Sequence, residues 1–184
     1  MPLEEKSYKR TRVLDAREER TVRFLRSHLV EGSKILDLGM LNPLSKAMSK
    51  AGYDVSNTSS PDLDVDITCA KQDGFDAFTS FEVFEHMVNP MPLLASIKAP
   101  VLFASVPLSL WFAKAYRGNT KEDQFDEHYH EFEPWQFELL LNKSGWRITH
   151  EEQWASYERF PKGIRPLLRR FYPRYYLVRA VRKP

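Results

Sequence analysis

Short apolar runs alternate with segments of helical spacing along most of the chain. Seven runs have the length and composition of strands, at residues 34–38, 53–58, 63–67, 75–81, 101–106, 146–154 and 175–181. Strands that alternate with helices usually pair in parallel through right-handed crossovers. The link between the last two runs holds only a short possible helix, so one of these two strands is expected to run antiparallel. The pattern predicts an α/β fold with a seven-stranded, mostly parallel sheet.

Four helices are predicted from apolar residues at helical spacing and from residues that favour helix ends. Asp15 is expected to cap a helix that starts at Ala16, and Asn42 with Pro43 has the composition of a second helix start. Residues 90–98 form a third candidate helix. A fourth starts at Pro134 and ends at Gly145.

Length and composition favour one globular domain over the whole chain, 1–184. The 184 residues include 42% hydrophobic and 28% charged residues, which is typical of a folded protein. We expect a helical N-terminal segment at 1–30 and an acceptor-site or lid insertion at 107–133, which is too long for a plain connection. The single cysteine, Cys69, excludes an internal disulfide. The lack of a long apolar run predicts no transmembrane segment and a cytoplasmic location.

Three sequence segments carry a family resemblance. They are KILDLG at 34–39, FDAFTSFEVFEHMVNP at 75–90 and HYHEFEPWQFELLLNKSGWRI at 128–148. In their order and spacing they resemble the class I S-adenosylmethionine-dependent methyltransferases, in particular the small-molecule branch that includes ubiquinone-biosynthesis-like enzymes. The resemblance implies a Rossmann-like three-layer sandwich and S-adenosylmethionine as the cofactor.

The resemblance also implies cofactor-binding positions at the strand ends. Asp37 stands where the family has a carboxylate after the first strand, and Gly39 permits close approach of the backbone to a ligand. The family's further glycines are replaced by MLNP at 40–43, so Leu41 and Asn42 are expected to line the cofactor pocket. Phe81 and Glu82, after the fourth predicted strand, would border the cofactor, although Phe81 also fits a core position.

The acidic residue that commonly binds the ribose is missing from the end of the second predicted strand. Thr58 or Ser59 occupies the matching position, where a neutral hydroxyl would bind the ribose diol more weakly than a carboxylate. Asp64 is the preferred ribose ligand, and Asp66 with Ile67 resembles the family's adenine-edge pair. The alternative is that the aspartates of PDLDVDI form a solvated turn before a short strand.

The candidate catalytic residues are histidines. His128 and His130 lie in the 107–133 segment, with Trp111, Phe112, Tyr116 and Arg117, and either histidine could take a proton from a methyl acceptor. His86 is a further candidate base, although in this family it usually has an architectural role. Because no cysteine or further histidine stands nearby in sequence, we predict no metal site.

The C-terminal part of the chain is basic. From residue 159 onward the basic residues are Arg159, Lys162, Arg165, Arg169, Arg170, Arg174, Arg179, Arg182 and Lys183, with no acidic residue. These residues could contact RNA phosphates or an anionic membrane, or cover a helix and the last strand; we favour the last alternative.

The sequence leaves three hypotheses for function. The first is a methyltransferase that acts on O or N of a small molecule. The others are a catalytically weak or inactive binding module with the same fold, and an RNA or protein methyltransferase that uses the basic tail.

Overall fold

The computed structural model describes residues 12–58, 62–112, 128–155, 168 and 170–184. In this part of the chain, six strands form one sheet in the order β2-β1-β3-β4-β6-β5. The strands are β1 (Lys34–Asp37), β2 (Asp54–Asn57), β3 (Ala77–Phe81), β4 (Val101–Pro107), β5 (Trp146–Trp154) and β6 (Tyr175–Arg182). Strands β1 to β4 pair in parallel, and β6 pairs antiparallel with both β4 and β5. The predicted antiparallel strand near the C-terminus is confirmed as β6.

The sheet has six strands among the described residues, one fewer than predicted. Residues 63–67 were expected to form a strand, but they form a turn that leads into the 3-10 helix η1 (Thr68–Lys71). The aspartates explain the difference, because their carboxylates accept hydrogen bonds that a strand would direct to its neighbours. Asp62 accepts from the backbone N–H of Asp64 at 2.9 Å, and Asp66 accepts from both the N–H and the hydroxyl of Thr68.

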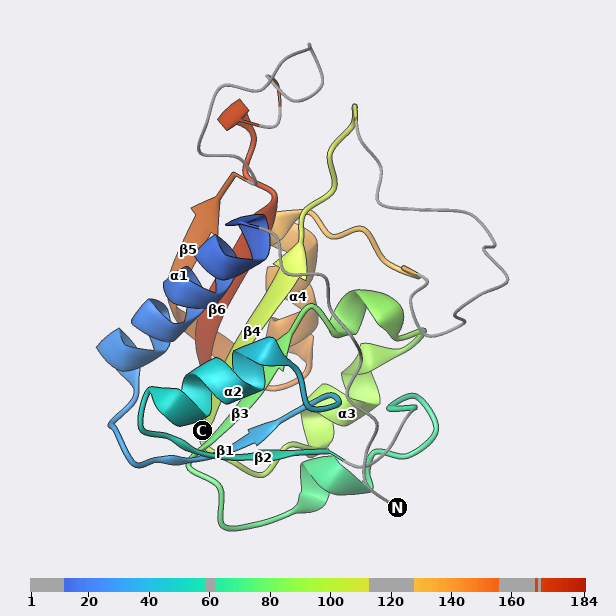
Figure 1. Ribbon diagram of the computed structural model, residues 1–184. Helices are drawn as coiled ribbons and strands as arrows, with labels where there is room; N and C mark the ends of the chain where they lie inside the picture. Colours follow the sequence, from blue (N-terminus) through green and yellow to red (C-terminus); the bar gives the residue numbers. More distant parts are fainter. Residues whose placement is uncertain (1–11, 59–61, 113–127, 156–167, 169) are drawn as a thin grey trace.

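The helices cover both faces of the sheet (Figure 1). They are α1 (Arg12–His28), α2 (Pro43–Lys50), α3 (Pro90–Ser96) and α4 (Pro134–Lys143), together with η1 and the short 3-10 helix η2 (Phe84–His86). Helix α1 begins at Arg12, so Asp15 lies inside its first turn and does not precede the helix as predicted. The start of α2 is as predicted: Asn42 Oδ1 accepts from Ser45 N at 3.0 Å, and Pro43 is the first helical residue.

Two hydrophobic clusters form the core, one on each side of the sheet. Phe24 and Leu25 of α1 pack with Met48 of α2 against one face of the strands. On the other face, Leu93 of α3 and Phe137 of α4 pack in a second cluster with side chains of the alternate sheet positions. The predicted three-layer sandwich is therefore confirmed, with α1 and α2 on one side and α3 and α4 on the other (Figure 1).

Arg182, at the end of β6, joins the two helices of the second layer. Its guanidinium donates to Ser144 O at 3.0 Å, after α4, and to the carbonyls of Leu94, Ala95 and Ile97 at the end of α3. Its guanidinium carbon lies 4.3 Å from the centroid of the Trp146 ring. These carbonyls are ones that a helix end leaves without an intrahelical donor, so Arg182 supplies their missing partner.

Replacing Arg182 by methionine should therefore destabilise the fold. Arg182→Met keeps the apolar stem and removes the charged donors, which should lower the free energy of unfolding by about 2–3 kcal/mol. Urea denaturation followed by tryptophan fluorescence measures the change. Arg147→Met, at an exposed position of β5, is the matched control and should have little effect. Equal losses in the two variants would contradict the role of Arg182.

Candidate functional site

The strand order places a candidate site at the carboxyl ends of β1 and β3. From β1 the chain passes to β2 on one side, while the strands that follow lie on the other side, beginning with β3. In an open α/β sheet, ligands bind where the strand order reverses in this way. The residues at this point are Asp37, the loop at 38–42, and the residues that follow Phe81.

Asp37 lies beneath this site and is buried, with 3% of its surface exposed. Its Oδ1 accepts a hydrogen bond from the Thr79 hydroxyl at 2.6 Å, and its Oδ2 accepts from Ser45 Oγ at 2.7 Å and from Asn57 Nδ2 at 3.1 Å. Burial raises the pKa of Asp37, while the bonds from Thr79, Ser45 and Asn57 act in the opposite direction. The carboxylate thus connects the end of β1 with β3, α2 and β2. Through these contacts it positions the loop that follows β1.

The loop after β1 is held by the end of β2. Gly39 N donates to Thr58 Oγ1 at 3.1 Å, and the Gly39 carbonyl accepts from Asn57 Nδ2 at 3.2 Å. Thr58 is buried, and its hydroxyl, a predicted ribose ligand, is the group that accepts this Gly39 N–H. Gly39 has φ 144°, and among the described residues an added Cβ would come within 4 Å of Val83 Cγ2 alone, at 3.8 Å. Leu41 is 38% exposed, outside the core.

The aspartates between β2 and η1 have structural partners. Asp64 accepts from the backbone N–H groups of Val88 at 2.8 Å and Asn89 at 2.9 Å, and so fixes the entry into α3. Hydrogen bonding to Thr68 lowers the pKa of Asp66. Ile67 is half-buried against the core. Ser59 lies outside the described residues.

Glu82 begins the turn that leaves β3. It has φ 57°, a left-handed conformation that is uncommon for a residue other than glycine and often marks a functional site. Its N–H donates to the Ser105 carbonyl at 3.0 Å, and its Oε1 accepts from the Ser105 hydroxyl at 2.8 Å. Its Oε2 lies 3.8 Å from Arg17 Nη1. Phe81, half-buried, packs against the cluster on the α1 side.

Beside the turn after Glu82, a carboxylate and two imidazoles lie close together; Glu85 and His86 belong to η2, and His128 to the segment before α4. Glu85 is 1% exposed, and its Oε1 lies 3.8 Å from His86 Nε2. The rings of His86 and His128 are 4.6 Å apart between centroids, and one ligand atom from each of the three residues lies within 4.8 Å of the others. Burial and then the charge of Glu82 raise the pKa of Glu85 well above its ordinary value. Each side chain offers a ligand atom that divalent metals bind.

This cluster was not predicted, because His86 and His128 are 42 residues apart in the sequence. The sequence contained one usable signal: Glu85 and His86 directly follow a buried strand, at the edge where ligands bind. His130 has a different environment, since its Nε2 lies 3.2 Å from the Val88 carbonyl. Of the three predicted catalytic histidines, the structure therefore brings His86 and His128 together.

The chain around the cluster is fixed by backbone hydrogen bonds. The N–H groups of Tyr129 and His130 both donate to the Glu85 carbonyl, at 2.8 and 3.2 Å. Ser109 N donates to the Phe132 carbonyl at 2.8 Å, which joins the two ends of the predicted 107–133 insertion. Trp111 is exposed and Phe112 half-buried, whereas Tyr116 and Arg117 lie outside the described residues.

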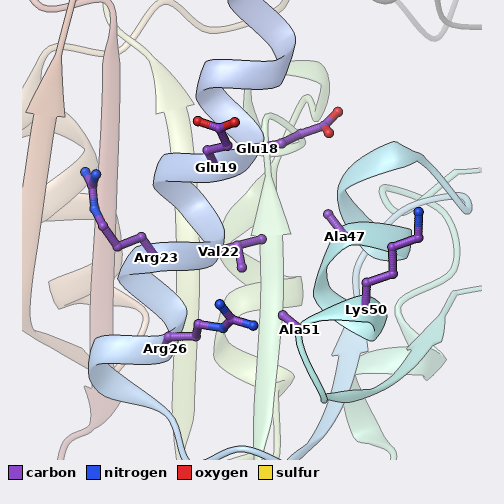
Figure 2. Close-up of a pocket in the computed structure, with 8 residues that line it drawn as sticks. All are labelled: Glu18, Glu19, Val22, Arg23, Arg26, Ala47, Lys50 and Ala51. Carbon is purple, nitrogen blue, oxygen red and sulfur yellow. The ribbon is translucent and has the colours of Figure 1, made fainter.

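A groove lies elsewhere, between α1 and α2, with a volume of about 620 Å³. Figure 2 shows Glu18, Val22 and Arg26 extending from α1 toward Ala47 and Lys50 of α2. Its charged residues are two acids and three bases, and none of the eight lining residues belongs to the switch-point site. The strand topology and the buried polar contacts favour the switch point as the functional site.

The strand order, the helical layers and the site at the β1–β3 switch point define a class of fold. It is the fold of the class I S-adenosylmethionine-dependent methyltransferases, as comparison with solved structures shows. The sequence itself matches no protein-family model and no curated protein.

Three similar structures illustrate the likeness. A chain in the complex of the Haloferax volcanii Trm112 methyltransferase activator with a candidate methyltransferase has 12% identity and a TM-score of 0.61, covering 96% of this chain and 100% of that one. An S-adenosylmethionine-dependent methyltransferase from Mesorhizobium loti has 19% identity and a TM-score of 0.54, with 92% and 100% covered. Magnesium protoporphyrin IX methyltransferase from Synechocystis, with bound S-adenosylhomocysteine, has 14% identity and a TM-score of 0.54, with 96% and 90% covered.

Three arginines of the basic C-terminal part bond within the fold. Besides Arg182, Arg174 Nη1 donates to the Leu108 carbonyl at 2.6 Å, and Arg179 Nη1 donates to Thr149 Oγ1 at 2.7 Å. These contacts agree with the interpretation that the arginines cover the last strand. None of the helices formed by the described residues is long and apolar enough to cross a membrane.

The support of Asp37 by Thr79 is testable by substitution on β3. Thr79→Val keeps the side-chain shape but removes the donor to a buried carboxylate, which should lower the free energy of unfolding by about 1.5–3 kcal/mol. Ser80→Ala is the control: the neighbouring Ser80 hydroxyl is buried and has no hydrogen-bond partner among the described residues, so its removal should be neutral or stabilising. Urea unfolding at pH 7 measures both. A Thr79→Val variant as stable as Ser80→Ala would show that Asp37 does not need this donor.

Proposed function

We propose that this protein is an S-adenosylmethionine-dependent methyltransferase that acts on an oxygen or nitrogen of a small molecule. The observation that carries the proposal is the loop of Gly39 at the switch point of a methyltransferase fold. Gly39 has a positive φ of 144°, and a Cβ added there would make van der Waals contact with Val83 after β3, although MLNP at 40–43 replaces the usual glycines. The complex of the Synechocystis enzyme with S-adenosylhomocysteine supports this choice of cofactor.

The cofactor would lie between the β1 loop and the residues after β3. Gly39, Leu41 and Asn42 would line one side, and Phe81 and Glu82 the other, while Asp37 and Thr58 hold the loop from beneath. Asp64 is the proposed ribose ligand, and Asp66 with Ile67 the proposed adenine edge; Ser59 is a further candidate. The backbone partners of Asp64 do not use all its acceptor capacity, because each carboxylate oxygen has a second lone pair.

The proposed chemistry depends mainly on positioning. When bound, S-adenosylmethionine supplies a methyl group already activated by a sulfonium. Correct orientation of the acceptor would therefore account for much of the rate enhancement. An acceptor that must lose a proton needs a base, and His86, His128 and His130 are the candidates. Val83 Cγ2 lies 3.8 Å from the position of a Cβ added to Gly39, and the 3-10 helix η2 that contains His86 follows Val83 directly.

Direct binding tests the cofactor assignment. The full chain titrated calorimetrically with S-adenosylmethionine and S-adenosylhomocysteine should show saturable heat. Gly39→Ala should weaken binding about tenfold or more, a loss on the order of 1.4 kcal/mol, because φ 144° is unfavourable for an L side chain and the new methyl group would point toward Val83, across the proposed cofactor site.

Gly32→Ala is the matched control for backbone strain. Gly32 also has a positive φ, 85°, and lies away from the switch point with open space around its Cβ position. Its substitution should leave cofactor affinity unchanged. Folded wild-type protein that binds neither compound would overturn the proposal and favour a binding module that kept only the fold.

A further inference from the structure

We propose that Glu85, His86 and His128 form a binding site for a divalent transition-metal ion, with zinc as the expected ion. The site goes beyond the proposed methyl transfer and does not depend on it, since metal binding can be measured without cofactor or acceptor. It also departs from the sequence-based prediction of no metal, which rested on the lack of a third ligand near His128 and His130 along the chain.

The geometry of the three side chains carries this proposal. In a tetrahedral zinc site with metal–ligand distances of about 2.0–2.2 Å, neighbouring ligand atoms are about 3.3–3.5 Å apart. Glu85 Oε1 and His86 Nε2 are separated by 3.8 Å, and all three ligand atoms lie within 4.8 Å of one another. Small side-chain rotations are therefore enough to close the three ligands around one ion.

A second observation points to a ligand at this position. Glu85 is almost completely buried, and its Oε2 has no hydrogen-bond partner among the described residues. A buried carboxylate oxygen without a donor is costly, because burial removes its water and nothing replaces it. A metal ion bound by both carboxylate oxygens, or by Oε2 after rotation of the carboxylate, would supply the missing interaction.

The charges around the cluster are balanced enough to admit a cation. Glu82 and Glu85 contribute two carboxylates, opposed by Arg17 and Arg174. Both arginines have other partners: Arg17 lies 3.8 Å from the Glu82 carboxylate, and Arg174 donates to the Leu108 carbonyl. Among the described residues, no arginine forms an ion pair with Glu85 itself.

The ligand set selects the class of metal. Two imidazoles with one carboxylate suit zinc and neighbouring transition metals, whereas magnesium and calcium prefer oxygen ligands. Three protein ligands leave at least one coordination position for water or for an oxygen of a substrate, as in catalytic zinc sites. With an ion bound, His86 and His128 would serve as ligands and no longer as bases.

Metal titration of untagged, full-length protein tests the site. After chelator treatment and removal of the chelator, the wild type should bind one Zn²⁺ per chain, and Co²⁺ in its place should give the visible absorption of a low-symmetry site. His128→Ala and Glu85→Gln should each weaken Zn²⁺ binding about 100-fold or more, because loss of even an outer-shell partner typically costs 10–100-fold. Circular dichroism confirms that each variant is folded.

Two histidines serve as controls. His130→Ala removes a nearby imidazole that faces the Val88 carbonyl. His150→Ala removes an exposed imidazole whose ring stacks on that of His28 at 4.1 Å. Neither should change Zn²⁺ affinity. X-ray absorption of the zinc-loaded wild type should show two imidazoles with oxygen ligands.

Two results would overturn the proposal: no stoichiometric Zn²⁺ or Co²⁺ binding by folded wild type, or loss of binding in His150→Ala with retention in Glu85→Gln. Binding of S-adenosylhomocysteine to the chelator-treated protein separates the two proposals. If the cofactor binds and Zn²⁺ does not, only the metal site is wrong. If Zn²⁺ binds and the cofactor does not, the proposed function is wrong and the metal site is retained.

Discussion

The buried carboxylate of Asp37 is the interaction on which the rest of the site depends. It receives donors from β3, α2 and β2, so three elements that are distant in sequence are held against the end of β1. Such a group is costly to bury and stabilises the fold only when donors surround it. Two of these donors have further contacts: Asn57 also donates to the Gly39 carbonyl, and Ser45 N donates to Asn42 at the start of α2. The shape of the loop thus follows from the satisfaction of one charge.

Local sequence signals were sufficient for much of this architecture. Asn42 and Pro43 determine where α2 starts through contacts within four residues, and the apolar runs of β1, β3 and β4 are buried on both faces whatever their partners. The run at 63–67 was mispredicted for an equally physical reason. Alternating aspartates and apolar residues resemble a strand in sequence, but the aspartate side chains bind backbone N–H groups, and those of Asp64 lie 24 and 25 residues away.

The histidine cluster shows where sequence-based prediction ends. Glu85 and His86 were identified as polar residues after a buried strand, and His128 as a candidate base, but their proximity results from two backbone N–H groups that bind the Glu85 carbonyl. Such contacts have no sequence signature, because any residue except proline provides the same donor. The left-handed Glu82 is similar: its conformation is fixed by Ser105 on the next strand. The sequence therefore identified the candidate residues, but it did not predict that Glu85, His86 and His128 lie next to one another.

The pairing of Ser109 with Phe132 has an evolutionary consequence. Because the chain leaves β4 and returns to α4 at adjacent, hydrogen-bonded points, the intervening stretch is closed by the fold itself. Lengthening a closed segment is inexpensive, since each doubling adds only about 0.6 kcal/mol of closure entropy. Related chains could therefore differ in the length of this stretch ahead of His128 while Glu85, the two imidazoles and the loop of Gly39 keep their arrangement. Variation in loop length would then be separable from the buried contacts that shape the candidate site.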